Sequence, residues 1–154
     1  MIATPPRKPK LAPAPVREPD TIVTRLVSLL AAFRYAFAGV RYLLWTQRNA
    51  KIHCAIASLV VVAGFVFRIS RVDWLALVVT IALVLALEGV NTAIEAAVDL
   101  AMPQYHPLAK IAKDVAAGTV LLAAVAAVIV GMLVFMPYLW PFVSDWLGQL
   151  HAGV

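Results

Sequence analysis

Charged residues are scarce in this sequence. Asp, Glu, Lys and Arg make up 14% of its 154 residues, whereas hydrophobic residues make up 63%. Soluble domains contain about 25% charged and about 45–50% apolar residues. Together with a mean hydropathy of +0.90, this composition excludes an ordinary soluble domain and indicates that lipid surrounds much of the chain.

The sequence contains only one cysteine, and it contains none of the familiar phosphate-binding motifs. The single cysteine, Cys54, sits in an apolar run, so no disulfide forms within the chain and Cys54 is expected to be a packing residue. No G-x-x-x-x-G-K-[ST], G-x-G-x-x-G or protein-kinase H-R-D and D-F-G motif is present. If a nucleotide binds, side chains and metal must hold it.

The first twenty residues differ from the rest. Residues 1–20 contain six prolines, four basic residues and no apolar core of the length that a cleavable signal needs. Proline removes backbone donors and disfavours helix, so we predict a disordered or extended arm. Its basic residues would rest on anionic head groups or remain in solution.

The pattern predicts four helices, one on the membrane surface and three across it. From 22 to 48, apolar residues recur at three- and four-residue steps, with Arg34, Arg41 and Arg48 beside them, which favours a surface helix over one packed on its own protein. Apolar runs then predict spans over 51–68, 73–100 and 108–137. Prolines 137 and 141 are expected to end the third span, with a polar tail over 143–154. The membrane domain is thus 21–142.

Lysine and arginine set the expected orientation. Nine lie before the first span or at its first residue, Lys51; two, Arg68 and Arg71, lie at the first loop; two follow the second span and none follows the third. The positive-inside rule places the N-terminus and the 101–113 loop in the cytoplasm and the C-terminus outside.

The second predicted span carries an unusual polar face. With Glu88 at zero on a helical wheel, Asn91 falls at about −60°, Glu95 at about −20° and Asp99 at about +20°. An ionised carboxylate inside a span costs at least a few kcal/mol, so these groups need cations or protons. Lys110, Lys113 and Asp114 of the third span offer charges at the cytoplasmic end; the hydroxyl of Thr92 is expected to bond its own backbone.

Three interpretations of this face remain open. The carboxylates pair with lysines to pack helices, or they form an ion or proton path, although Thr80 is the sole polar residue between Leu75 and Leu87. Alternatively they form a catalytic site in which carboxylates hold Mg²⁺, a lysine meets phosphate and one carboxylate takes a proton from a lipid hydroxyl. Only the catalytic interpretation uses every component.

The stretches "EGVNTAIEAAVDL" and "YHPLAKIAKD" resemble the prokaryotic diacylglycerol kinase family, which includes the undecaprenol kinases. The resemblance covers about residues 25–136, and "RNAKIH" and "YHPLAKIAKDVAAG" are more similar to the undecaprenol kinase branch. It implies an all-α integral membrane enzyme of the bacterial inner membrane, built of a surface helix and three spans, that forms homotrimers with shared active sites. The implied reaction moves the γ-phosphate of MgATP to a lipid alcohol, either undecaprenol or diacylglycerol.

The resemblance also assigns roles to individual residues. Glu88 matches the catalytic base, Glu95 a metal-binding carboxylate, and Asn91 and Lys113 the phosphate side and catalytic centre. With Glu95 and Lys113, the positions expected around the nucleotide are Tyr35, Asp99, Gln104, Tyr105, His106 and Asp114.

One departure from the family pattern raises a rival function. Gln47 stands where the family has its second metal-binding carboxylate; its carbonyl can bind Mg²⁺ but brings no charge. A catalytically weakened relative that packs or regulates other membrane proteins is therefore the leading alternative to the kinase. His53 and His151 are expected to be ordinary residues outside the site.

Overall fold

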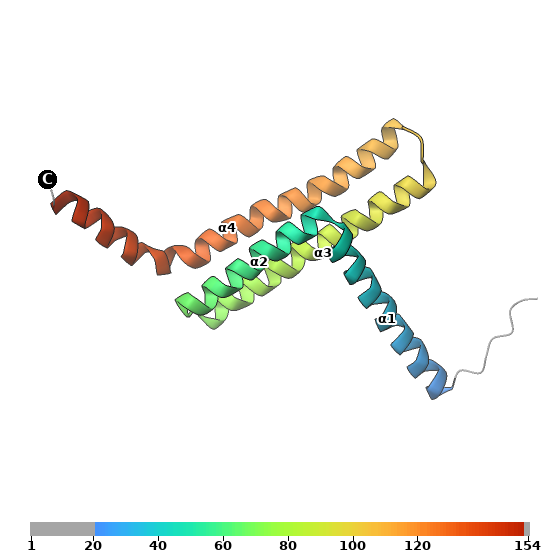
Figure 1. The fold of residues 1–154 in the computed structure, drawn as a ribbon, viewed down its shortest axis with the longest axis horizontal. Coiled ribbons are helices and arrows are strands. Elements are labelled where there is room, and N and C mark those ends of the chain that lie inside the picture. The colour runs from blue at the N-terminus through green and yellow to red at the C-terminus, as the bar shows by residue number, and fades with distance from the viewer. Residues whose placement is uncertain (1–20, 153–154) are drawn as a thin grey trace, which may run out of the picture. The chain divides into compact units, whose positions relative to one another are not determined.

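The computed structural model describes residues 21–152, with side chains described through residue 142 and at Ser144. Every regular element in these residues is a helix: α1 (Ile22–Thr46), α2 (Arg48–Phe67), α3 (Arg71–Ala101) and α4 (Pro107–Ala152), as Figure 1 shows. The predicted arm over 1–20 lies outside the described residues. The all-helical fold is thereby confirmed.

The chain forms two compact units, Met1–Ala36 and Phe37–Val154, which are described separately. All four helices are long and apolar enough to cross a membrane by length and composition, α1 among them. Helix α1 contains no buried residue. The prediction that α1 lies on the membrane surface while the other three helices cross the membrane therefore stays a prediction.

A tight turn joins α2 to α3, as the sequence "RISRVD" predicts. Arg68 ends α2 in the left-handed region (φ 51°, ψ 48°), and the amides of Arg68 and Ile69 donate to the carbonyls of Phe65 and Gly64. Ser70 then begins α3 with a capping box, in which its hydroxyl accepts from the Asp73 amide and the Asp73 carboxylate accepts from the Ser70 amide. Two helix ends are thus satisfied within a few residues.

The core lies next to this turn and ties α4 to it. Ile69, Leu77 and Val134 are buried together, with Trp74 and Phe135 among the side chains packed around them. The Tyr138 hydroxyl donates to Asp73 at 2.8 Å and accepts from the Ser70 amide at 3.0 Å. Helix α3 packs against both α2 and α4, so these contacts fix the register of the bundle at the end where α3 begins.

The helix of the third predicted span does not end at its prolines. Pro137 and Pro141 both lie inside α4, which continues to Ala152, so most of the predicted polar tail is helical. Proline removes one backbone donor and clashes with the carbonyl four residues earlier, which bends a helix without always stopping it. Figure 1 shows this bend where α4 passes from orange to red.

We expect Gly64→Ala to destabilise the bundle. A Cβ at Gly64 would lie 2.8 Å from Cη2 and 2.9 Å from Cζ2 of Trp74, whose ring packs on Phe65 with centroids 4.9 Å apart. Because the ring has little room to shift, α2 and α3 must separate, at a cost of about 1–3 kcal/mol. Thermal unfolding in detergent micelles, followed by circular dichroism, measures the loss.

The matched control is Gly118→Ala in α4, where a Cβ meets no atom within 4 Å. Alanine favours helix over glycine, so this variant should be neutral or slightly more stable. Equal melting temperatures for the two variants would contradict the close packing of Trp74 on α2.

Candidate active site

The polar face of α3 spans the depth of a bilayer leaflet. Measured along α3 from Asp73 at about 1.5 Å per residue, Glu88 lies about 22 Å away, Glu95 about 33 Å and Asp99 about 39 Å. A hydrocarbon core is about 30 Å thick. With one boundary at Asp73, Glu88 lies inside the opposite leaflet, Glu95 at its surface and Asp99 in water.

Glu88 is the most deeply buried large side chain of the described residues. It is 2% exposed, and its Oε2 atom has no hydrogen-bond partner in the part of the chain that the structure describes. One turn away, Asn91 is 6% exposed and its Oδ1 atom is likewise without a partner there. Buried carboxylates and amides are costly unless paired, so both atoms indicate a missing ligand or neighbour.

Hydrogen bonds along α3 order this face. The Asn91 amide nitrogen donates to Glu95 Oε1 at 3.1 Å, which fixes the half-buried Glu95 carboxylate one turn from the buried pair. The Thr92 hydroxyl donates to the Glu88 carbonyl at 2.9 Å, which confirms that it bonds its own backbone. Glu88, Asn91 and Glu95 therefore form an ordered set in which Glu88 Oε2 and Asn91 Oδ1 are buried without a partner among the described residues.

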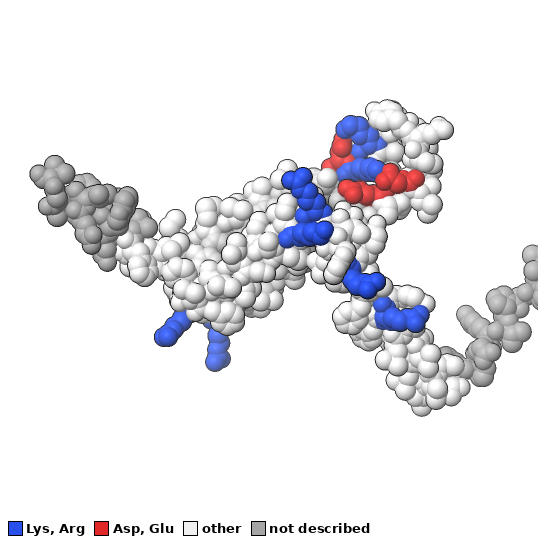
Figure 2. Space-filling view, viewed as in Figure 1, with Lys and Arg blue, Asp and Glu red and all other residues white. Residues whose placement is uncertain are grey.

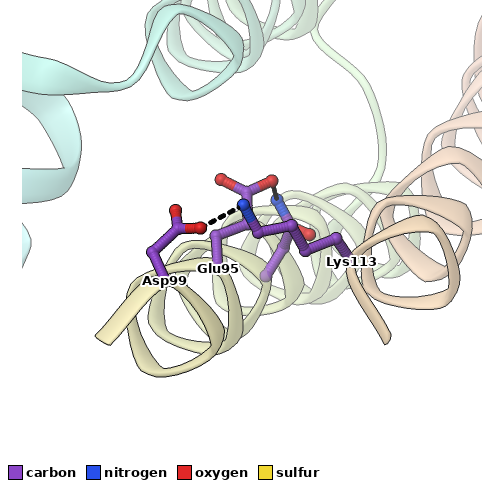
Figure 3. Close-up of polar contacts among 4 residues, drawn as sticks. Glu95, Asp99 and Lys113 are labelled. Carbon is purple, nitrogen blue, oxygen red and sulfur yellow. Dashed lines mark hydrogen bonds and ion pairs between the residues drawn. The ribbon is translucent and has the colours of Figure 1, made fainter. Parts of the chain in front are cut away.

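Lysines of α4 form ion pairs with some of the acidic residues, while other acidic residues have no such pair among the described residues. Lys113 Nζ bonds Asp99 Oδ1 at 2.5 Å across the α3–α4 hairpin, and Figure 3 shows its side chain reaching to Asp99 beside Glu95. Lys110 pairs with Asp114 along α4. Neither Glu88 nor Glu95 is in an ion pair among the described residues. Two acidic groups on one face therefore remain without a cation.

The acidic side chains visible in the space-filling view gather at one end of the hairpin, together with some of the basic ones (Figure 2). A cavity of about 330 Å³ opens there between α3, the 102–106 loop and the start of α4. Its lining brings together five residues predicted to surround a nucleotide: Asp99, Gln104, Tyr105, His106 and Lys113. The other three, Tyr35, Glu95 and Asp114, are not in the lining, although Asp114 is paired with Lys110, which is.

His106 has a structural role beside any ligand contact. Its Nδ1 atom accepts from the Leu108 amide at 3.2 Å, immediately before α4 begins at Pro107. Proline at the first helical position has no amide to satisfy, so this bond caps the helix. The Nε2 atom is then the ring nitrogen left for a ligand.

Gln47 lies at the junction of α1 and α2. It is the N-cap of α2, and its side chain makes no capping hydrogen bond. Its backbone N–H donates to the carbonyl of Leu43 at 3.0 Å. Leu43 in turn lies near α3, because a Cβ built on Gly89, the residue after Glu88, would lie 3.6 Å from Leu43 Cδ2. The junction thus lies against the turn of α3 that carries Glu88, and the Gln47 side chain has no hydrogen bond among the described residues.

The roles of the predicted site residues stay predictions, the metal site and Tyr35 among them. Among the described residues, no three His, Cys, Asp or Glu side chains are grouped so that they could hold a metal ion. A Mg²⁺ site at Glu95 and Gln47 would need oxygen ligands from elsewhere, such as phosphates. Tyr35 belongs to the N-terminal unit, where it is 66% exposed and the Arg34 guanidinium lies 5.3 Å from its ring centroid.

His53, which the sequence predicts to be an ordinary residue outside the site, lies among apolar side chains. It lines a groove of about 270 Å³ between α2, α3 and α4, where the other lining residues, Thr80 apart, are apolar. Its sequence signal, a titratable residue at the start of an apolar run, does not distinguish a packed histidine from one beside a site.

Comparison with known proteins matches the sequence of this chain to one family. Residues 34–135 match the family model described as prokaryotic diacylglycerol kinase. The chain is 50% identical over 111 residues to a diacylglycerol kinase of Synechocystis sp., a match that covers 71% of this chain and 63% of that protein. It is 42% identical over 108 residues to an undecaprenol kinase of Bacillus subtilis, which covers 70% of this chain and 88% of that protein.

These matches bear on the expected branch. The chain spans slightly less than two thirds of the Synechocystis relative and most of the Bacillus one. The higher identity is to the protein named a diacylglycerol kinase, although the motifs suggested the undecaprenol kinase branch. The names of the relatives therefore do not choose between the two lipid alcohols.

We predict that Glu88→Met stabilises the ligand-free protein. The variant replaces a buried carboxylate that has an unpartnered oxygen by an apolar side chain of similar length, which removes a cost of at least about 1 kcal/mol. The melting temperature in micelles should rise by about 3 °C or more. The control is Glu95→Met, which loses the hydrogen bond from Asn91 and should gain less or become less stable. A lower melting temperature for Glu88→Met would mean that its carboxylate is already paired in the assembled protein.

Proposed function

The chain belongs to the prokaryotic diacylglycerol kinase family, and we propose that it transfers the γ-phosphate of ATP to the hydroxyl of a lipid alcohol. The observation that carries the proposal is the buried Glu88 carboxylate, whose Oε2 atom has no partner among the described residues. A carboxylate kept uncompensated inside a leaflet is expensive. Functional sites are where such a cost is retained.

Glu88 acts as the general base. Its Oε2 atom accepts the proton of the lipid hydroxyl as that oxygen attacks the γ-phosphorus and the bond to the β-phosphate oxygen breaks. The hydroxyl must lie within hydrogen-bond distance of Oε2, which at the depth of Glu88 is reached from within the membrane. Only the head of the acceptor enters the site, while its hydrocarbon chain stays among acyl chains.

Asn91 and Glu95 form the metal and phosphate side of the site. Carboxylate and amide oxygens are ligands that Mg²⁺ prefers, so Glu95 and the uncommitted Gln47 would hold the ion that accompanies ATP. Bound there, Mg²⁺ neutralises charge on the phosphates. The Asn91 amide nitrogen keeps Glu95 oriented, and its Oδ1, buried without a partner among the described residues, is available to a ligand.

Lys113 and the loop cavity receive the rest of the nucleotide. Lys113 is 36% exposed and is held by Asp99, which keeps its ammonium group at the rim of the cavity. An approaching phosphate can compete with Asp99 for that ammonium group. We assign Gln104, Tyr105, His106, Asp114 and Tyr35 to contacts with the base, sugar and outer phosphates.

The setting proposed for this reaction is the bacterial inner membrane. The helices fit a bacterial membrane protein, and the distribution of lysine and arginine puts the cavity end in the cytoplasm, where ATP is. Assembly as a homotrimer would supply neighbours for Glu88 and Asn91 and further ligands for Mg²⁺. The acceptor is undecaprenol or diacylglycerol, the lipids named in the relatives.

A regulatory or scaffolding relative with weakened activity is the second candidate. It is favoured by the neutral Gln47 and by the lack of a three-membered acidic or histidine cluster among the described residues. An ion path gains no support from the structure, because the Thr80 hydroxyl, between Leu75 and Leu87, donates to the Ala76 carbonyl.

Glu88→Gln should remove phosphoryl transfer. Without a base, the rate should fall by about 10²–10⁴-fold, while the affinity for ATP changes little because Glu88 is outside the cavity lining. Purified protein in micelles is supplied with labelled ATP and, separately, undecaprenol and diacylglycerol, and lipid phosphate is counted. The control Thr92→Val loses one hydroxyl bound to its own backbone and should retain most activity. Full turnover by Glu88→Gln would rule out the assigned base.

Gln47→Glu should lower the Mg²⁺ concentration needed for half-maximal activity. A carboxylate at this position adds a charged ligand where the amide contributes only a carbonyl. The control is Asn49→Asp, which adds the same charge two residues away at an exposed position of α2. The same decrease in both variants would show a general effect of charge and would leave Gln47 without a metal contact.

A further inference from the structure

Helix α4 is much longer than a membrane span. Its 46 residues extend for about 69 Å at about 1.5 Å per residue, against about 30 Å of hydrocarbon. The family match ends at residue 135, whereas α4 continues to Ala152. The last part of α4 therefore lies beyond the matched region, and its position has to be explained from its own residues.

Tyr138 fixes the depth at which this extra segment begins. Its hydroxyl donates to Asp73 and accepts from the Ser70 amide, so it lies level with the α2–α3 turn. The same turn carries the exposed Arg68 and Arg71. Charged and hydrogen-bonded groups of this kind mark the polar edge of a bilayer. This edge is at the opposite end of the bundle from the cavity.

A straight continuation beyond Tyr138 would be unfavourable. It would carry α4 about 20 Å into water, together with side chains that are already exposed: Leu139 (40%), Trp140 (60%) and Phe142 (68%). Pro137 and Pro141 flank Tyr138 inside α4 and weaken the helix at this point, where it bends. The bend allows the segment to leave the direction of the span.

The sequence of the segment has the period of an amphipathic helix. Apolar residues recur at 139, 142, 143, 146, 147 and 150, in steps of three and four, while polar residues stand at 144, 145, 149 and 151. The backbone is helical to Ala152. A helix with one apolar and one polar face, joined to a span at the edge of the hydrocarbon, fits a membrane interface.

We propose that residues 139–152 form an interfacial helix on the bilayer surface away from the active site, with their apolar stripe against acyl chains. The partner is the lipid of the same bilayer. Tyr138 sets the depth of this helix and the two prolines set its direction. The proposal does not depend on the kinase reaction.

Nitroxide labels can test this position in the full chain in phosphatidylcholine–phosphatidylglycerol liposomes. Cys54, the single cysteine, is changed to alanine, and cysteines are placed one at a time at Phe142 and Ser144. Collisions with oxygen report lipid and collisions with a water-soluble nickel complex report water. Leu122, which is 72% exposed on α4, serves as the lipid reference. The exposed Ala101, about 42 Å along α3 from Asp73, serves as the water reference.

The expected result is an oxygen-to-nickel collision ratio several-fold higher at 142 than at 144, with both values between those of the references. Water-like values at both positions would overturn the proposal, because the helix would then project from the membrane. Values equal to Leu122 at both positions would also overturn it. The proposal would also be overturned if both labels were immobile and reached by neither reagent, because this would indicate contact with protein.

A second variant tests the role of the bend. Changing both Pro137 and Pro141 to alanine restores two backbone donors and should straighten α4. The label at position 142 should then shift toward the water reference. An unchanged collision ratio at 142 would show that the prolines do not direct the helix into the interface.

Discussion

The structure depends on how one buried carboxylate is tolerated. Glu88 is placed about 22 Å along α3 from the polar edge at Asp73, within hydrocarbon, and one of its oxygen atoms has no partner among the described residues. A core built for stability alone would place an apolar residue there. The rest of the bundle compensates at a distance, through the buried contacts around Ile69 and the hydrogen bonds of Tyr138 at the opposite end.

The acidic residues of α3 form a graded series through the leaflet. Asp99, near the water, is paired with Lys113, whereas Glu95 only accepts a hydrogen bond from Asn91, and Glu88 has neither a cation nor a donor on Oε2 among the described residues. The deeper the carboxylate lies, the less the chain itself compensates it. This order is the reverse of what packing would favour. This order is explained if phosphate, metal and a lipid hydroxyl bind beside Glu95 and Glu88 and supply the partners that the chain does not.

Much of this site follows from sequence spacing, because a helix repeats every 3.6 residues. That repeat puts Glu88, Asn91 and Glu95 on one face, and the i, i+4 pair of Lys110 with Asp114 follows in the same way. Contacts between helices could not be predicted, since the pairing of Lys113 with Asp99 requires the register of the α3–α4 hairpin. Nor could the continuation of α4, because proline disfavours helix locally while Tyr138 and the following residues keep it helical.

The central claim is that Glu88 faces the space where an acceptor hydroxyl meets ATP. The most direct measurement is modification of Glu88 by an apolar carbodiimide, which attacks carboxyl groups within membranes, followed by mass spectrometry of the peptide. The account predicts that Glu88 is modified in the free protein and is protected by a lipid alcohol with a non-hydrolysable MgATP analogue. A lipid whose hydroxyl is capped as a methyl ether should protect much less. Equal modification with and without these ligands, or equal protection by the capped lipid, would contradict the account.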